Sequence, residues 1–253
     1  MTRPLLAAVR AQANMLSSDY YTIDTAGLRI SADQASNFAK AIAGDFNPLH
    51  DPDNRRFCIP GDLLFTVLLQ HYGISQRMYF RFSGMVGANV ALQLEENPGD
   101  AYELRDAAGK TYLHVDRSGE TTHDSQLIER LARSYVAFSG QSFPHILVPL
   151  MRDQGVMINV ERPLVIYESM EFELERLDIP NVELRLADSL MKVDGKRGDV
   201  RLTFEFLCGE MVVGTGCKRL LISGMRPYEQ DGMDQLVNAY LARRDNYRSS
   251  GST

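Results

Sequence analysis

The segment that follows Pro60-Gly61-Asp62 most constrains how this chain can fold. Its apolar residues point in nearly every direction of a helix before Gly73 ends the pattern: Leu63, Leu64, Phe65, Val67, Leu68 and Leu69. A helix that is apolar all round has to be buried on every side. We therefore expect a central helix enclosed by other elements. Strand-like stretches around 79–95, 101–106 and 110–116 follow it and can supply an enclosing sheet.

Another helix is predicted shortly before this one. Ser31 and Gln34 have the spacing of a capping box, and apolar residues then recur with the period of a helix as far as Ile42. Gly44 is placed to end the helix in a left-handed conformation. The residues after Gly44 therefore begin an ordered turn.

This turn carries an acid and an imidazole five residues apart. Asp45 and His50 flank Asn47-Pro48, and Pro48 keeps Asn47 out of helical geometry. Turn propensities alone favour a structural role, in which Asp45 and Asn47 bond their own backbone. The chemical alternative is a carboxylate and an imidazole held around one water molecule. That arrangement suits adding water across a double bond, or removing it.

The stretch Gly44-Asp45-Phe46-Asn47-Pro48-Leu49-His50 resembles the signature of the MaoC-like (R)-specific enoyl-thioester hydratases. The resemblance covers roughly residues 30 to 95 and continues through 57–64 and 80–87. It implies an α+β hot-dog fold, in which an antiparallel sheet wraps a central helix. It also implies a lyase that hydrates 2-enoyl thioesters, or dehydrates 3-hydroxyacyl thioesters, carried by CoA or acyl carrier protein. Asp45 and His50 would be catalytic, with Asn47 orienting the water or the loop.

Contacts to the substrate are expected at the start of the central helix. Free backbone N–H groups near Gly61 and Asp62, together with the helix dipole, would stabilise an enolate-like oxygen. The absence of a side chain at Gly61 would let a thioester carbonyl come close. Arg55 and Arg56 are candidate contacts to an anionic thioester carrier, and Phe57 lies in the resembling stretch. No cofactor and no metal ion is expected.

The chain departs from the family pattern in two places. Only residues 51–56 separate His50 from Phe57, where the family usually has a longer segment that helps to shape the acyl pocket. Pro60 stands where the family tends to have His. Two alternatives therefore stay open. A hot-dog thioesterase would use one acid to activate water against the carbonyl carbon. A non-catalytic acyl-thioester-binding protein would bind without turnover, and the shortened segment favours it.

The second half of the chain repeats the order of the first. A helical pattern at 123–139 leads to 140–145, where Gly140 and Pro144 keep the spacing of Gly44 and Pro48. An apolar segment and further strand-like runs follow, the last at about 211–222. We predict a double hot-dog with units at 17–118 and 119–225, then a C-terminal helix and frayed tail at 226–253. Gln141 replaces Asp45 in the second unit, which should be catalytically silent. Chance similarity and a single hot-dog with an inserted helix are the alternatives.

Composition limits the class of protein. Of the 253 residues, 44% are hydrophobic and 24% charged, as in ordinary globular proteins. A net charge of -6 argues against a general nucleic-acid binder. Cys58, Cys208 and Cys217 form no C-x-x-C pair, which fits a reduced cytoplasm.

The sequence also bears on membranes and assembly. No apolar run approaches a membrane span. Residues 1–16 have too short an apolar stretch for a signal peptide and are expected to form a short amphipathic surface helix. We therefore expect a cytoplasmic protein that binds an acyl thioester and no membrane, and a homodimer is compatible with these features.

Overall fold

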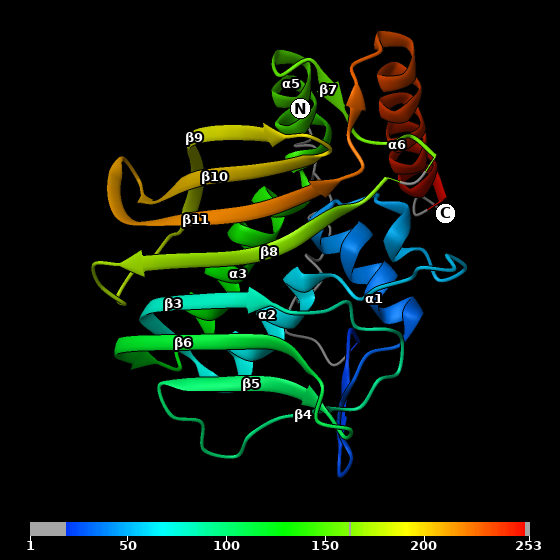
Figure 1. The fold of residues 1–253 in the computed structure, drawn as a ribbon. Helices are drawn as coiled ribbons and strands as arrows, with labels where there is room; N and C mark the ends of the chain where they lie inside the picture. Colours follow the sequence, from blue (N-terminus) through cyan, green and yellow to red (C-terminus); the bar gives the residue numbers. More distant parts are fainter. Residues whose placement is uncertain (1–18, 162, 251–253) are drawn as a thin grey trace, which may run out of the picture.

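The computed structural model describes residues 19–161 and 163–250, which form an α+β protein built on one large antiparallel sheet (Figure 1). The helices are α1 (Ala32–Phe38), α2 (Gly61–Tyr72), α3 (Ser125–Gly140), α4 (Ser142–His145), α5 (Leu147–Asp153) and α6 (Gln230–Ser250), with a π-helical turn η1 (Ala39–Ala43) and a 3-10 turn η2 (Pro48–His50). The strands are β1 (Thr22–Asp24), β2 (Gly27–Arg29), β3 (Ile74–Phe82), β4 (Leu92–Gln93), β5 (Ala101–Asp106), β6 (Thr111–Thr122), β7 (Val156–Met157), β8 (Val165–Leu174), β9 (Glu183–Asp194), β10 (Arg197–Cys208), β11 (Met211–Ser223) and β12 (Arg226–Pro227).

The sheet joins the two halves of the chain edge to edge. Its strand order is β1-β2-β4-β5-β6-β3-β8-β11-β10-β9, and β3 pairs with β8 at the junction, where Met78 lies opposite Phe172. Outward from that junction the two sides mirror each other, as β3-β6-β5-β4 and β8-β11-β10-β9. The two halves of the chain therefore share one continuous sheet. The unit boundaries stay a prediction, and the one at 118/119 falls inside β6.

The central helix is α2, as the sequence indicates. Its Phe65 ring is fully buried and packs against Phe80 of β3, at 5.1 Å between ring centroids, and against Tyr135 of α3, at 4.9 Å. Burying such a side chain stabilises the fold by about 1.5–3 kcal/mol. In Figure 1, α2 and α3 pass behind the sheet. A helix enclosed by an antiparallel sheet, the α+β hot-dog arrangement, is thus confirmed.

The helix that leads to the motif begins and ends as predicted. The Ser31 hydroxyl accepts a hydrogen bond from the Gln34 N–H at 3.1 Å, and the Gln34 side chain accepts one from the Ser31 N–H at 2.9 Å. After α1 the helix widens into η1, and Gly44 ends it with φ 65°. A residue with a Cβ rarely adopts that conformation, so a glycine is required there.

Two local predictions were wrong. β3 begins at Ile74 rather than near 79, and 83–91 is a connection rather than strand. The backbone of that connection bonds to distant segments, since Ile59 N–H donates to the Val86 carbonyl and Asn89 N–H to the Ile30 carbonyl. Within the range 226–253, expected to hold a helix and a frayed tail, the helix continues to Ser250.

Some predictions fall where the structure gives no description. The amphipathic helix expected at 1–16 and residues 251–253 lie outside the described residues. Within 19–161 and 163–250, no helix combines the length and the apolar character needed to cross a membrane.

Candidate active site

The turn after Gly44 is held by its own polar side chains. Asp45 Oδ1 accepts a hydrogen bond from the Asn47 N–H at 2.9 Å, and Asn47 Oδ1 accepts one from the Leu49 N–H at 3.1 Å, which caps η2. Asn47 and one oxygen of Asp45 therefore bond the backbone of their own turn, as turn propensities predict. The other oxygen, Oδ2, remains available to His50.

Asp45 and His50 converge, as the sequence predicts. His50 Nε2 lies 3.6 Å from Asp45 Oδ2, and their side chains are 11% and 26% exposed. His50 Nδ1 lies 2.8 Å from the Cys58 carbonyl, which can only accept, so Nδ1 carries a proton. Burial lowers the pKa of His50, but Asp45 and the Cys58 carbonyl outweigh it and raise that pKa to about 10. The imidazole is therefore charged at neutral pH, with Nε2–H facing the carboxylate.

The pair opens onto a cavity of about 760 Å³. Its wall combines the 45–50 turn, the N-terminus of α2, the end of α3, strands β8 and β11, and one side of α6. Apolar side chains such as Leu64, Val86 and Leu236 make up much of the wall. Both halves of the chain therefore build one site.

The structure brings five of the predicted site residues to this cavity, and they are Asp45, Asn47, His50, Gly61 and Asp62. The other three are elsewhere: Phe57 packs beside the core, and Arg55 and Arg56 are exposed, so none of them lines the cavity.

Gly61 has a different role from the one that the sequence predicts. A Cβ on Gly61 would lie 2.9 Å from the Tyr167 ring and 3.0 Å from the Phe82 ring. Those two rings, which contact each other in a tilted arrangement with centroids 4.3 Å apart, fill the space that the glycine leaves. The glycine is therefore needed for packing and does not open room for a carbonyl.

Sequence reasoning missed several polar residues of the cavity wall, and two of them are buried in the core of the sheet and helices. Ser139 near the end of α3 and Lys218 on β11 both line the cavity and are buried. Lys218 could have been found from its position, because it shares the inward face of β11 with Gly216 and Leu220. A lysine among core-facing strand positions is unusual, since lysine is almost never fully buried without a partner.

The C-terminal helix α6 covers the motif turn. The buried Tyr240 hydroxyl accepts a hydrogen bond from the Phe46 N–H at 3.2 Å and lies 3.3 Å from the Gly44 carbonyl. Arg243 of α6 lines the cavity and pairs with Asp51, whose carboxylate also meets Lys40 at 2.8 Å. Arg243 is therefore a cation of the cavity wall in addition to the buried Lys218, whereas Arg55 and Arg56 do not line the cavity.

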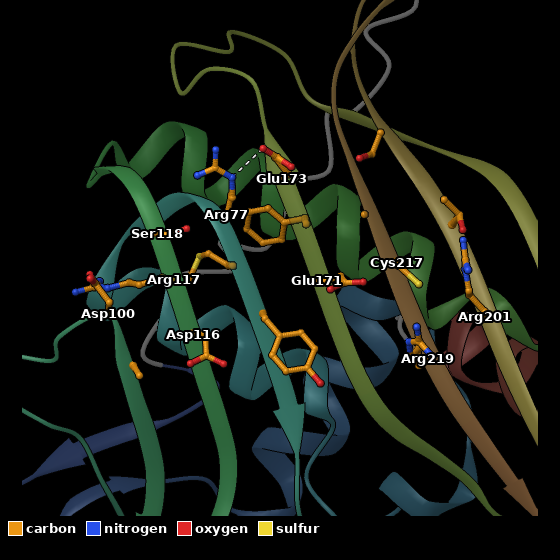
Figure 2. Close-up of a pocket in the computed structure, with 17 residues that line it drawn as sticks. Arg77, Asp100, Asp116, Arg117, Ser118, Glu171, Glu173, Arg201, Cys217 and Arg219 are labelled. Atoms are coloured by element: carbon orange, nitrogen blue, oxygen red, sulfur yellow. Dashed lines mark hydrogen bonds and ion pairs between the residues drawn. The ribbon is translucent and has the colours of Figure 1, made fainter.

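Another hollow, of about 800 Å³, lies on the opposite face of the sheet (Figure 2). Successive strand residues point to opposite faces, so Cys217 and Arg219 line this hollow while Lys218 faces the first cavity. Arginines and carboxylates are equally represented in the hollow, and Arg77 pairs with Glu173 at 2.9 Å. This balanced, exposed surface shows no preference for a ligand of either charge.

Within 19–161 and 163–250, no three His, Cys, Asp or Glu side chains are grouped so that they could hold a metal ion.

Three solved structures show a weak resemblance to this chain. A putative oleoyl thioesterase from Lactobacillus plantarum has 6% identity and a TM-score of 0.34, over 77% of this chain and 90% of that one. The peroxisomal multifunctional enzyme type 2 of Drosophila melanogaster has 10% identity and a TM-score of 0.42, over 76% and 47%. The 12:0-ACP thioesterase of Umbellularia californica has 13% identity and a TM-score of 0.25, over 79% and 91%. Similarities this low carry no argument about function.

The sequence comparisons give a family. No curated protein matches the chain. The model of a family described as "Protein of unknown function (DUF3581)" matches residues 15–231. That range contains the motif turn, α2 and β11, and it ends at the start of α6. The chain therefore belongs to the DUF3581 family.

Proposed function

We propose that this protein adds water to 2-enoyl thioesters, or removes it from 3-hydroxyacyl thioesters. The observation that carries the proposal is the convergence of the Asp45 carboxylate and the His50 imidazole, 3.6 Å apart, at a cavity beside the N-terminus of α2. One water molecule can lie within hydrogen-bond distance of both groups. A largely apolar cavity of about 760 Å³ has the size of a small-molecule site and suits an acyl chain.

Hydration by this pair leaves the protonation states of Asp45 and His50 unchanged at the end of each cycle. The Asp45 carboxylate takes a proton from water as the water oxygen bonds to Cβ. The His50 imidazolium gives its Nε2 proton to Cα. Asp45 then returns its proton to His50, which restores both groups. The raised pKa of His50 keeps the acid protonated before the substrate binds. Each such role is typically worth about 10² to 10⁴ in rate.

The negative charge that develops on the thioester oxygen needs donors. The first N–H groups of a helix have no partner within the helix and lie at the positive end of its dipole. In α2 these belong to Gly61 and Asp62, which line the cavity. One preorganised donor is worth roughly 3 kcal/mol. Arg243 supports an anionic carrier such as CoA or acyl carrier protein.

The direct test is hydration of crotonyl-CoA and longer 2-enoyl-CoAs, followed by loss of the absorbance of the conjugated thioester. Asp45→Asn and His50→Ala should each lower the rate at least about a hundredfold. The two losses should not add, because both groups act on one water. Gln141→Ala, at the position that the predicted repeat pairs with Asp45, is the matched control and should change the rate little.

Other outcomes would replace the proposal. Release of free thiol without loss of the double bond would identify a thioesterase, which needs Asp45 but not His50. Binding of acyl-CoA without turnover of any enoyl thioester would identify a non-catalytic binder. Unchanged rates in a folded Asp45→Asn protein would rule out the mechanism. A cytoplasmic location and a homodimer remain predictions.

A further inference from the structure

Two aromatic rings lie beside the N-terminus of α2, where the two halves of the chain join. Phe82 is at the end of β3 and Tyr167 is on β8, and these two strands pair at the junction of the sheet. Their ring centroids are 4.3 Å apart, with an angle of 34° between the ring planes. Both residues line the cavity, and both keep part of their surface exposed. The two rings, called the aromatic wall below, therefore form a surface that a ligand in the cavity meets.

The aromatic wall is held in place from behind. The Tyr167 hydroxyl shares a hydrogen bond with the hydroxyl of Tyr135, which is fully buried in α3. Lys218 Nζ lies 4.1 Å from the centroid of the Tyr167 ring. The Tyr167 ring cannot turn aside without losing these contacts, and Phe82 packs against it. The wall is therefore a fixed surface rather than an adaptable one.

The position of the wall relative to a bound thioester follows from Gly61. A Cβ on Gly61 would lie 2.9 Å from Cδ1 of Tyr167 and 3.0 Å from Cε1 of Phe82. The backbone N–H of this same glycine is one of the donors proposed above for the thioester oxygen. A carbonyl oxygen that accepts from it lies about 2.9 Å from its nitrogen. The aromatic wall would therefore flank the carbonyl and C2 of the acyl chain, which is bonded to the carbonyl carbon.

We propose that Phe82 and Tyr167 are specificity-determining residues that restrict the substrate to thioesters without a branch at C2. The inference rests on the proposed function for the place of the carbonyl. It deepens that function by naming the substrate class, 2-enoyl thioesters that carry a hydrogen at C2. Tyr135 is a positioning residue, because it acts only through the Tyr167 ring.

The selection would come from the lack of space beside the wall. A conjugated 2-enoyl thioester is planar and can lie along a flat aromatic surface. A methyl group on C2 would either overlap a ring or move the carbonyl away from the N–H groups of α2. Closely packed, fixed side chains do not make room for an added methyl group without cost. One such group typically changes kcat/KM about 10- to 200-fold in an apolar pocket.

The experiment compares crotonyl-CoA with 2-methylcrotonyl-CoA, which differs from it only by the methyl group at C2. The ratio of the two kcat/KM values is measured in each variant, because the intrinsic difference in reactivity then cancels. Phe82→Ala should lower the ratio at least about tenfold, and it should do so by raising the value for 2-methylcrotonyl-CoA. Tyr135→Phe should lower the ratio less, because the Tyr167 ring stays but loses its hydrogen bond. A ratio that falls only because crotonyl-CoA reacts more slowly overturns the inference.

A matched control removes apolar volume from another part of the same cavity. Leu236 of α6 lines the cavity away from β3 and β8, so Leu236→Ala should leave the ratio unchanged. An equal change in Leu236→Ala and Phe82→Ala would show that cavity size, and not the aromatic wall, sets the preference. Phe82→Leu keeps an apolar side chain at the position and takes the place of Phe82→Ala if the alanine variant does not fold.

Binding separates this inference from the proposed function. In the Asp45→Asn protein, where hydration is slowed, calorimetry should show 2-methylcrotonyl-CoA binding at least about tenfold more weakly than crotonyl-CoA, and Phe82→Ala should reduce this difference. Such a difference, in a wild-type protein that hydrates neither thioester, keeps the wall and removes the hydratase. Hydration that depends on Asp45, with a ratio that Phe82→Ala leaves unchanged, does the reverse. A protein that binds neither thioester removes both.

Discussion

The Tyr240 hydroxyl should stabilise the turn that carries Asp45 and His50, and Tyr240→Phe tests this. The hydroxyl accepts from the Phe46 N–H at 3.2 Å and can donate to the Gly44 carbonyl at 3.3 Å or the Gly140 carbonyl at 3.4 Å. Phenylalanine keeps the ring, which packs against Phe46 and Phe143 at 6.0 and 5.2 Å between centroids. The substitution therefore removes hydrogen bonds and little apolar contact.

The size of the effect follows from burial. Phe46 is only 4% exposed, so its N–H would be left without water or another partner. Leaving one buried donor unsatisfied costs about 1–3 kcal/mol. We expect the free energy of unfolding, measured by urea denaturation and circular dichroism, to fall by that amount. Hydration of crotonyl-CoA should fall by up to about 10²-fold, because the turn positions Asp45 and small displacements of a catalytic group are costly.

A matched control isolates the buried hydroxyl. Tyr228 hydrogen-bonds Gln230 at 3.3 Å in an exposed setting, so Tyr228→Phe should change stability by less than about 0.5 kcal/mol. If the two variants unfold at the same urea concentration, the Tyr240 hydroxyl does not hold the turn. If Tyr240→Phe loses stability but keeps full activity, the turn does not depend on α6 for its catalytic geometry.

Two further predictions concern pH and packing. The pKa of His50 is raised to about 10, above its unfolded value near 6.5, so its contribution to stability is complete below about pH 6.5 and is lost as the pH rises towards 10. In urea unfolding, the free energy of unfolding should fall by up to about 1.4 kcal/mol per pH unit over this range, and His50→Gln should abolish that dependence. Hydration activity should decline above about pH 10. Gly140→Ala would place a Cβ 2.1 Å from the Ala43 carbonyl oxygen and should cost about 1–3 kcal/mol or more by the same assay. Gly99→Ala, with nothing within 4 Å, should cost less than about 0.5 kcal/mol, and equal losses would contradict the packing argument.

The parts of the fold that the sequence predicted best depend on short-range patterns. The capping box of Ser31 and Gln34, the left-handed Gly44 and the buried α2 each follow from residues within one or two turns. The convergence of Asp45 and His50 is local in the same sense, because five residues and one proline determine it. Such interactions do not depend on how the remaining elements pack.

What could not be predicted depends on contacts between distant residues. The connection at 83–91 is not a strand because its backbone bonds to residues before and after the motif turn. Arg55 and Arg56 were placed near the site from sequence proximity alone, whereas Arg243 reaches it from nearly the other end of the chain. Gly44 and Gly140 match in the predicted repeat for different reasons. Gly44 adopts a positive φ, which favours glycine. Gly140 is helical, and it leaves no room for a Cβ because the backbone of Ala43 packs directly against it.

The cavity draws its wall from both halves of the described chain. Asp45 and His50 come from the first half, whereas Ser139 and Lys218 come from the second and hold the Asp62 side chain. α6 also contacts the ends of η1 and α3, because the Tyr240 hydroxyl lies near the carbonyls of Gly44 and Gly140. A fragment ending before α3 would keep the Asp45–His50 pair but would leave Asp62 without its hydrogen-bond partner. The proposed activity of the Asp45–His50 pair would therefore require residues of the second half.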